Sequence, residues 1–172
     1  MKIIEAMKQV KMNEEKIADL QGKVAQTCAH SSIETSPYGQ DAKSKVAGWL
    51  QSCSDITQEN ISLLCAIQRT NLATDVTIEL GGKKVTKTIA EWVWRRRKYA
   101  AMDQATWSKL TDKGIQEGAF KASPDGDPLQ VTVVRYYDPS ERDEKIQMYR
   151  EEPHRIDATL EVVNATTELI AA

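Results

Sequence analysis

Cations and aromatic rings gather in one short segment of the chain, residues 89–99. Two tryptophans are followed there by four consecutive cations, in the order Trp-Val-Trp-Arg-Arg-Arg-Lys-Tyr. Guanidinium groups match phosphate oxygens, and aromatic faces stack on planar rings. The same residue types also suit a helix–helix interface. The segment therefore predicts either a site for a planar, anionic, nucleotide-like molecule or a contact with another protein surface.

A helical period places Arg96 on the apolar side of its helix, beside Trp92. A buried arginine needs a partner, because an unpaired charge in a dry site is strongly unfavourable. We consider two partners. One is a carboxylate, such as Asp103 or Glu14; the other is an anionic ligand, held together with Asn71 at the junction between helix and hairpin.

The other residues of the segment have simpler expected roles. Arg95 is expected to pair with Glu91 one turn earlier, whereas Arg97 and Lys98 should face water. Core packing is the alternative role for the tryptophans, and setting of helix register is the alternative for Asn71. The expected ligand-binding set is Arg69, Asn71, Trp92, Arg95, Arg96 and Tyr99.

The usual signatures of catalysis are missing from the sequence. His30 and His154 do not form a pair at the His-x-x-x-His spacing of a metal site. The pair Gly81-Gly82 reads as a hairpin turn rather than a phosphate loop, and there is no nucleophile elbow. We therefore expect a protein that is not an enzyme, with no catalytic residue, no metal and no cofactor.

Long helices with narrow apolar seams must position the cationic segment. A first helix has a predicted seam of Ile3, Met7, Val10, Glu14, Ile17, Gln21, Val24 and Cys28. A loop at 29–40 leads to a second helix over about 41–71, which should pair with the first as an antiparallel hairpin. A third helix is expected from about residue 88 to 112. The last begins after Asp138 as a cap and Pro139 as its first residue, with a kink or break expected before Pro153.

The period changes from helical to alternating between residues 75 and 88. This pattern and Gly81-Gly82 predict a β-hairpin over 72–88, inserted in a single helical domain that spans 1–172. A loop is expected at 113–128, and a strand at 129–137 should pair with that hairpin. The expected fold class is mainly α: an antiparallel helical hairpin or bundle of about four helices, a small β-hairpin and one further short strand.

Composition limits the class of partner. The 172 residues carry a formal net charge of −2, so nucleic acid is an unlikely partner of the whole surface and any anion site must be local. No apolar run has membrane-spanning length. Three cysteines without metal-type spacing read as reduced, mostly buried thiols of a cytoplasmic protein.

Several short stretches resemble the septicolysin-like family of small helical proteins. These are Arg-Thr-Asn-Leu-Ala-Thr at 69–74, the helix start at 89–96, the opening residues 1–8 and the ending that includes Val-Asn-Ala-Thr-Thr-Glu-Leu at 163–169. The chain departs from the family at the loop over 114–128, at the following strand, and at Arg95-Arg96-Arg97, where members tend to have an Arg-Asp pair. The family name implies a cytolysin, but no membrane-inserting segment is present. The resemblance implies a fold and a bacterial or phage origin.

Two classes of function follow. The first is a non-enzymatic, homo-oligomeric binding protein that holds a nucleotide-like anion; in a phage this would sequester a host immune signalling nucleotide in the host cytoplasm. The second is a phage virion or assembly protein that acts through helix-mediated protein contacts. The long, narrow seams favour a homo-oligomer in both cases.

Overall fold

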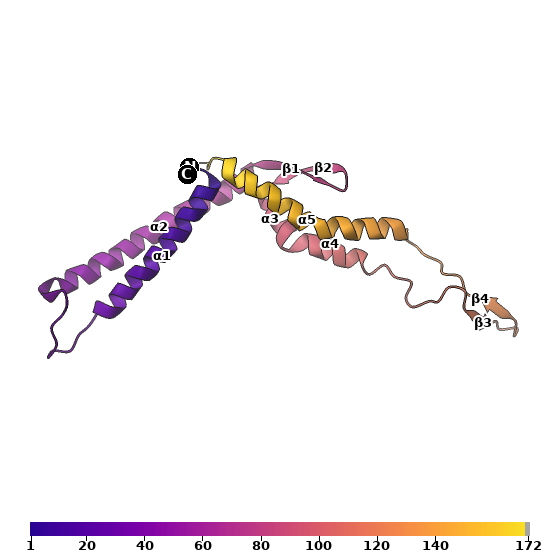
Figure 1. Ribbon diagram of the computed structural model, residues 1–172, viewed down its shortest axis with the longest axis horizontal. Helices are drawn as coiled ribbons and strands as arrows, with labels where there is room; N and C mark the ends of the chain where they lie inside the picture. The colour runs from indigo at the N-terminus through magenta and orange to yellow at the C-terminus, as the bar shows by residue number, and fades with distance from the viewer. Residues whose placement is uncertain (171–172) are drawn as a thin grey trace. The chain divides into compact units, whose positions relative to one another are not determined.

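The structure is a computed structural model that describes residues 1–170, and it is mainly helical, as the sequence predicts. Figure 1 shows two long helices followed by a small hairpin and further helices. The helices are α1 (Ile3–Thr27), α2 (Ala42–Ala73), α3 (Ile89–Trp94), α4 (Ala100–Trp107) and α5 (Pro139–Thr166). A 3-10 helix, η1 (Gly39–Asp41), precedes α2, and a π-helical turn, η2 (Arg95–Tyr99), joins α3 to α4. The strands are β1 (Asp75–Leu80), β2 (Lys83–Thr88), β3 (Phe120–Ala122) and β4 (Pro128–Gln130).

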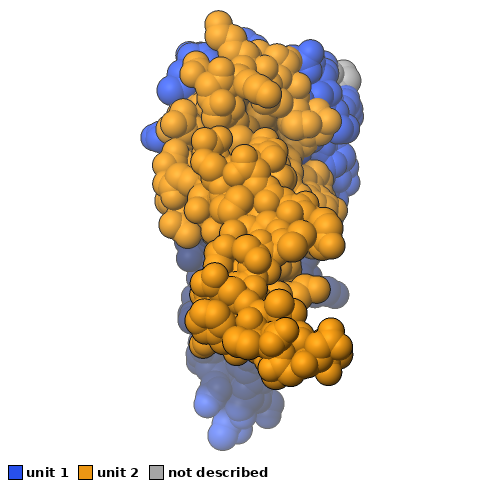
Figure 2. Space-filling model, turned by 90° about the vertical axis from the view of Figure 1, so that its right-hand side faces the viewer, with its two compact units in different colours: residues 1–76, 88–90, 160–172 blue, residues 77–87, 91–159 orange. Residues whose placement is uncertain are grey.

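The chain forms two compact units, and the expected single domain over 1–172 stays a prediction. Of the described residues, the first unit contains 1–76, 88–90 and 160–170, and the second contains 77–87 and 91–159 (Figure 2). The physical reason lies in the composition. With one phenylalanine and 28% charged residues, the chain supplies narrow seams rather than the material of one thick core.

In the first unit, α1 and α2 lie side by side as the expected antiparallel hairpin (Figure 1). The seam of α1 differs from the prediction by one residue. Its buried side chains are Ile3, Ala6, Val10, Asn13 and Leu20, whereas Met7 of the predicted seam is 52% exposed. The seam of α2 follows the prediction more closely, with Ile56, Asn60 and Ile67 buried.

A buried pair of amides accounts for the shift in α1. The Asn13 side chain donates a 2.8 Å hydrogen bond to the Asn60 amide oxygen, and Asn60 donates a 3.5 Å bond to the Val10 carbonyl. The predicted seam would instead bury Glu14, whose charge would need a cation that α2 does not offer at this level. Two seams related by one residue share Ile3 and Val10, so apolar spacing alone does not separate them.

The ends of the described chain meet within the same unit. The Ile3 amide donates to the Thr167 carbonyl, and the Leu169 amide donates to the Met1 carbonyl. The Ile170 amide donates a 2.9 Å bond to the hydroxyl of Thr70, which is fully buried. The cysteines differ from the prediction, because Cys28 and Cys65 are exposed and Cys53 is half-buried.

In the second unit, β1 and β2 form the predicted hairpin. The turn glycines have positive φ values of 54° for Gly81 and 73° for Gly82, as tight hairpin turns require. The hydroxyls of Thr77 and Thr86 lie 2.7 Å apart across the strands. A Cβ atom at Gly81 would lie 3.0 Å from the Met148 sulfur, so the turn packs closely on α5.

The segment between α4 and α5 differs from the prediction. The third helix ends at Trp107 rather than near residue 112, and the expected loop at 113–128 contains β3. Strand β4 covers 128–130, where a strand over 129–137 is expected. It pairs with β3 instead of the hairpin, with Lys121 opposite Leu129. A local glycine-containing turn makes this short ribbon, because neighbouring segments can pair with little loss of entropy.

Helix α5 begins as predicted but does not break. The Asp138 carboxylate accepts a 2.8 Å hydrogen bond from the Ser140 amide, which is a helix cap. Of the two alternatives expected before Pro153, a kink or a break, the break is wrong, because the helix continues through Pro153 to Thr166. Proline removes only one backbone donor, so the helix can continue past it. Among the described residues, no helix combines the length and the apolar character needed to cross a membrane.

Candidate anion-binding site

Arg95 is the central charged residue of the second unit. Its Nε and Nη2 atoms donate bonds of 2.7 and 2.6 Å to the two carboxylate oxygens of Glu152, and Nη1 donates a 2.5 Å bond to Asp103. The Glu152 side chain is only 1% exposed, and that of Arg95 is 21% exposed. The forked geometry neutralises a buried carboxylate with a planar cation. The hydrogen bond with Glu152 raises the pKa of the Arg95 guanidinium above its ordinary value.

Tyr149 lies against this ion pair. The Arg95 guanidinium carbon lies 5.6 Å from the centre of the Tyr149 ring. Burial is the main cause that raises the pKa of the Tyr149 hydroxyl, and Asp103 adds to it, whereas Arg95 opposes it. The ring therefore stays neutral near pH 7 and covers one side of the charged pair.

The structure corrects the expected roles of Arg95 and Arg96. Arg95 is the inward residue and takes Asp103, the partner considered for Arg96, together with Glu152. Arg96 is exposed and pairs with Asp157, which is also exposed. The prediction assumed an unbroken α-helical period, but residues 95–99 form a π turn, which changes the direction of the side chains within it.

The other predicted residues belong to different surroundings. Arg69 is exposed and Asn71 is half-buried, and both belong to α2 in the first unit. The side-chain oxygen of Asn71 is buried without a hydrogen-bond partner among the described residues. Trp92 is fully buried in the second unit, and Tyr99 is 45% exposed there with the Lys98 ammonium 5.6 Å from its ring centre. The predicted set therefore divides between the two units.

A basic hollow of about 240 Å³ opens above Arg95 and is lined by strand β2 and helix α5. Strand β2 contributes Lys83, Val85 and Lys87, which alternation places on one face. Helix α5 contributes Lys145, Met148, Tyr149 and Glu152, and Trp92 and Arg95 complete the lining with Leu80. Within residues 1–170, no ion pair involves Lys83, Lys87 or Lys145. Because Glu152 is already neutralised by Arg95, the hollow carries an excess of positive charge.

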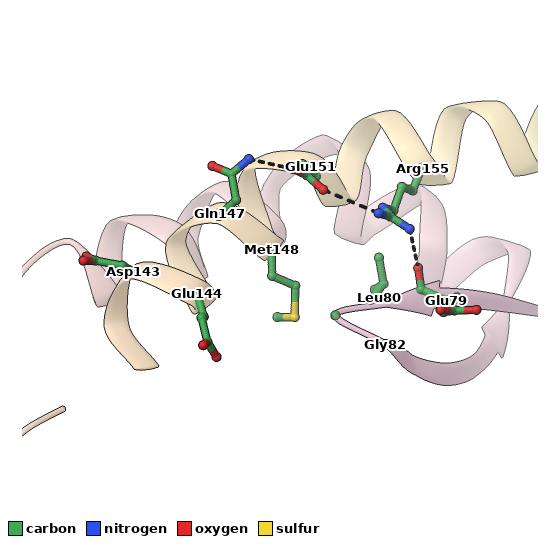
Figure 3. A pocket seen from close by; sticks show the side chains of 10 residues that line it. Glu79, Leu80, Gly82, Asp143, Glu144, Gln147, Met148, Glu151 and Arg155 are labelled. Atoms are coloured by element: carbon green, nitrogen blue, oxygen red, sulfur yellow. Dashed lines mark hydrogen bonds and ion pairs between the residues drawn. The ribbon is translucent and has the colours of Figure 1, made fainter. Parts of the chain in front are cut away.

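A second hollow, of about 600 Å³, lies by the tip of the hairpin and is acidic (Figure 3). Four carboxylates line it: Glu79, Asp143, Glu144 and Glu151. Its one cation, Arg155, is engaged by Glu151 at 3.5 Å and by the Glu79 carbonyl at 3.3 Å. Figure 3 shows Met148 pointing toward the hairpin turn, near Leu80. Leu80 and Met148 line both hollows, so anions are favoured on one side of this contact and disfavoured on the other.

Four residues of this site were not predicted from the sequence: Glu152, Lys83, Lys87 and Lys145. The clearest signal was Glu152, because it lies on the seam of α5 three residues after Tyr149 and four before Ile156. A carboxylate at such a position needs a cation. Lys83 and Lys87 could be placed on one face from the alternation of β2. Nothing in the sequence pointed to Lys145. Among the described residues, no group of three or more His, Cys, Asp or Glu side chains could hold a metal ion.

Comparisons with known proteins bear on the fold alone. No protein-family model and no curated protein matches the chain. A solved structure, described as a functionally unknown conserved protein from Corynebacterium diphtheriae, is similar over 99% of each chain with a TM-score of 0.57 and 17% sequence identity. The likeness supports the mainly helical architecture. The resemblance to the septicolysin-like family stays a prediction.

Proposed function

We propose that this protein is a non-enzymatic binding protein that holds a small, nucleotide-like anion in the basic hollow of the second unit. The observation that carries the proposal is the set of three lysines, Lys83, Lys87 and Lys145, that line one hollow without ion-pair partners among residues 1–170. Lysine ammonium groups bind phosphates as point charges, and they do so best where the surroundings exclude competing carboxylates.

The role of Arg95 in this proposal differs from that of the lysines. Its guanidinium is held by Glu152 and Asp103, so it forms a fixed wall of the hollow rather than a free ligand-binding fork. Because Arg95 is already held in place, it need not be ordered when a ligand binds, and this lowers the entropic cost of binding. The resemblance implies a bacterial or phage origin. If the chain is phage-encoded, the function that fits is sequestration of a host immune signalling nucleotide, which requires binding without turnover.

The test is a thermal-shift and calorimetric screen with inorganic phosphate, pyrophosphate, mononucleotides and cyclic dinucleotides. A ligand at one hundred times its dissociation constant should stabilise the folded protein by about 2.7 kcal/mol. The variants Lys83→Ala, Lys87→Ala and Lys145→Ala should each weaken binding. Lys84→Ala is the matched control, because Lys84 lies on the same strand between two lining residues but does not line the hollow.

Two outcomes would contradict the proposal. Absence of binding across the panel would remove the basic hollow as a ligand site. Release of a chemically altered nucleotide at repeated turnover would show an enzyme, whereas we expect the nucleotide to be recovered intact after heat denaturation.

A second candidate function, assembly through helix contacts, is favoured by one observation in the first unit. Four large apolar residues of α2 are about half exposed or more: Leu50, Ile61, Leu64 and Leu72. At about 100° per residue they lie within about 40° of a single line on the helix, and they span about 33 Å. We propose that a second copy of the chain covers this stripe in a homo-oligomer.

The assembly proposal has its own measurement. The parent protein should have a multimeric mass by light scattering at micromolar concentration, and Leu64→Lys should shift it toward the monomer. The exposed lysine of α2 at position 45 lies off the stripe, so Lys45→Glu should leave the mass unchanged. A monomeric parent would contradict the proposal.

A further inference from the structure

The π turn η2 changes which side chains meet on the outer face of its helix. In this turn the Ala100 amide donates to the Arg95 carbonyl, five residues earlier. Residues five apart therefore lie on the same side of the turn, whereas in an α-helix they diverge by about 140°. Trp94 and Tyr99 have this spacing. They line one hollow of about 340 Å³, and their exposed fractions are 58% and 45%.

This aromatic hollow adjoins the basic hollow. Its lining consists of Lys87, Glu91, Trp94, Arg95 and Tyr99, and two of these residues, Lys87 and Arg95, also line the basic hollow. The two hollows differ in chemistry. The basic hollow has three lysines suited to phosphate, whereas the aromatic hollow has two exposed rings and the carboxylate of Glu91, which disfavours phosphate there.

We propose that the aromatic hollow is the base-stacking subsite of the same ligand, so that the ligand is a nucleotide. Its planar base lies on Trp94 and Tyr99, and its phosphates lie among Lys83, Lys87 and Lys145. This inference rests on the proposed function and deepens it. Exposed tryptophan and tyrosine rings are the side chains on which bases stack, and stacking accepts every base because each has a π face. Recognition by this pair is therefore selective for a nucleotide over an inorganic anion.

The π turn supports this assignment independently of the exposure of the two rings. Such turns are rare and occur often at functional sites. Here the turn places two exposed aromatic residues in the lining of one hollow, beside an arginine held by carboxylates. The buried side of the helix is kept, since both Trp92 and Ala100 are fully buried. The helix thus presents a rigid binding face on one side and a core face on the other.

The experiment compares four probes by calorimetry on the full chain: pyrophosphate, adenosine diphosphate, ribose 5-phosphate and adenosine. Pyrophosphate reports the basic hollow alone. We expect adenosine diphosphate to bind roughly 5- to 150-fold more tightly than pyrophosphate, which is the range that stacking on an aromatic side chain contributes. Ribose 5-phosphate, which lacks the base, should bind no better than pyrophosphate.

Three variants assign the gain to the aromatic pair. Trp94→Ala and Tyr99→Ala should each reduce the affinity for adenosine diphosphate toward that for pyrophosphate and leave pyrophosphate binding unchanged, whereas Trp94→Phe should retain most of the gain. Tyr136→Ala is the matched control, because Tyr136 is 97% exposed but lies outside both hollows.

The outcomes separate this inference from the proposed function. If pyrophosphate and adenosine diphosphate bind equally, or if Trp94→Ala weakens both alike, the stacking subsite is wrong and the anion site survives. If adenosine binds but pyrophosphate does not, the basic hollow is wrong. If none of the four probes binds, both proposals fail.

Discussion

Replacement of Arg95 by alanine should strongly destabilise the protein. The variant leaves the Glu152 carboxylate, 1% exposed, without its two hydrogen bonds. Breaking a fully buried pair typically costs 3–5 kcal/mol. Because the Arg95 side chain is 21% exposed and Asp103 is 42% exposed, water compensates part of this loss, and we expect about 2–4 kcal/mol. For a chain of this size, the melting temperature should fall on the order of 5–15 °C.

Urea denaturation and thermal melting of four variants test this reasoning. Arg96→Ala is the matched control on the next residue, and it should cost less than about 1 kcal/mol because both Arg96 and Asp157 are exposed. The double variant Arg95→Met with Glu152→Leu removes both charges and should recover most of the stability, whereas Glu152→Leu alone leaves Arg95 with Asp103 and should be intermediate. A loss for Arg95→Ala no larger than that for Arg96→Ala would refute the assignment of Arg95 as the buried partner.

Three further predictions concern other parts of the fold. Asn13→Leu should lower the free energy of unfolding, measured by urea denaturation, by about 1–3 kcal/mol, because the buried Asn60 amide oxygen loses its hydrogen-bond donor. Adding Asn60→Leu should restore much of that stability. Gly81→Ala should lower the free energy of unfolding by about 1–2 kcal/mol because of its left-handed backbone. The loss should be larger than that for Gly82→Ala, because the new methyl group at position 81 would meet the Met148 sulfur, and Met148→Ala should reduce the difference between the two variants. Hydrogen bonding from Arg135 lowers the pKa of Asp112 below its ordinary value of 3.8. The ion pair therefore contributes stability above about pH 4, and this contribution is lost as the pH falls through the lowered pKa. Titration of the Asp112 carboxyl by NMR should show a midpoint below 3.8 that rises in Arg135→Ala.

The elements that the sequence predicted well are those with strong local signals. The helical hairpin, the Gly81-Gly82 turn and the start of α5 at Pro139 each depend on residues close together in the chain. Such signals hold because capping, turn chemistry and apolar period act within a few residues. The same period placed Glu14 on the seam of α1 instead of Asn13, because the burial of Asn13 depends on Asn60, 47 residues away.

The charged residues of the site were harder to predict for a related reason. The partner of Arg95 is 57 residues away, on a helix whose proline pointed to a break. The π turn then changed the side chains that a regular helix would bring inward. Arg96 was consequently assigned the partner that Arg95 has. Lys145 joins Lys83 and Lys87 only through the packing of α5 on the hairpin, which no local pattern in the sequence specifies.

The π turn adds one residue to the helix relative to a regular α-helix that would bury the same side chains. Trp92 and Ala100 are both fully buried although they are eight residues apart, whereas a regular α-helix returns to the same face after seven, with a drift of about 20°. Deletion of Arg97, which has no ion pair among the described residues, would therefore convert the turn into ordinary helix and leave the buried face almost in phase. The same deletion would bring Trp94 and Tyr99 four residues apart and change how the two side chains line the aromatic hollow. A change in chain length of a single residue would thus remodel the outer surface of this helix while its core stays in place, a kind of variation that substitutions alone do not reach.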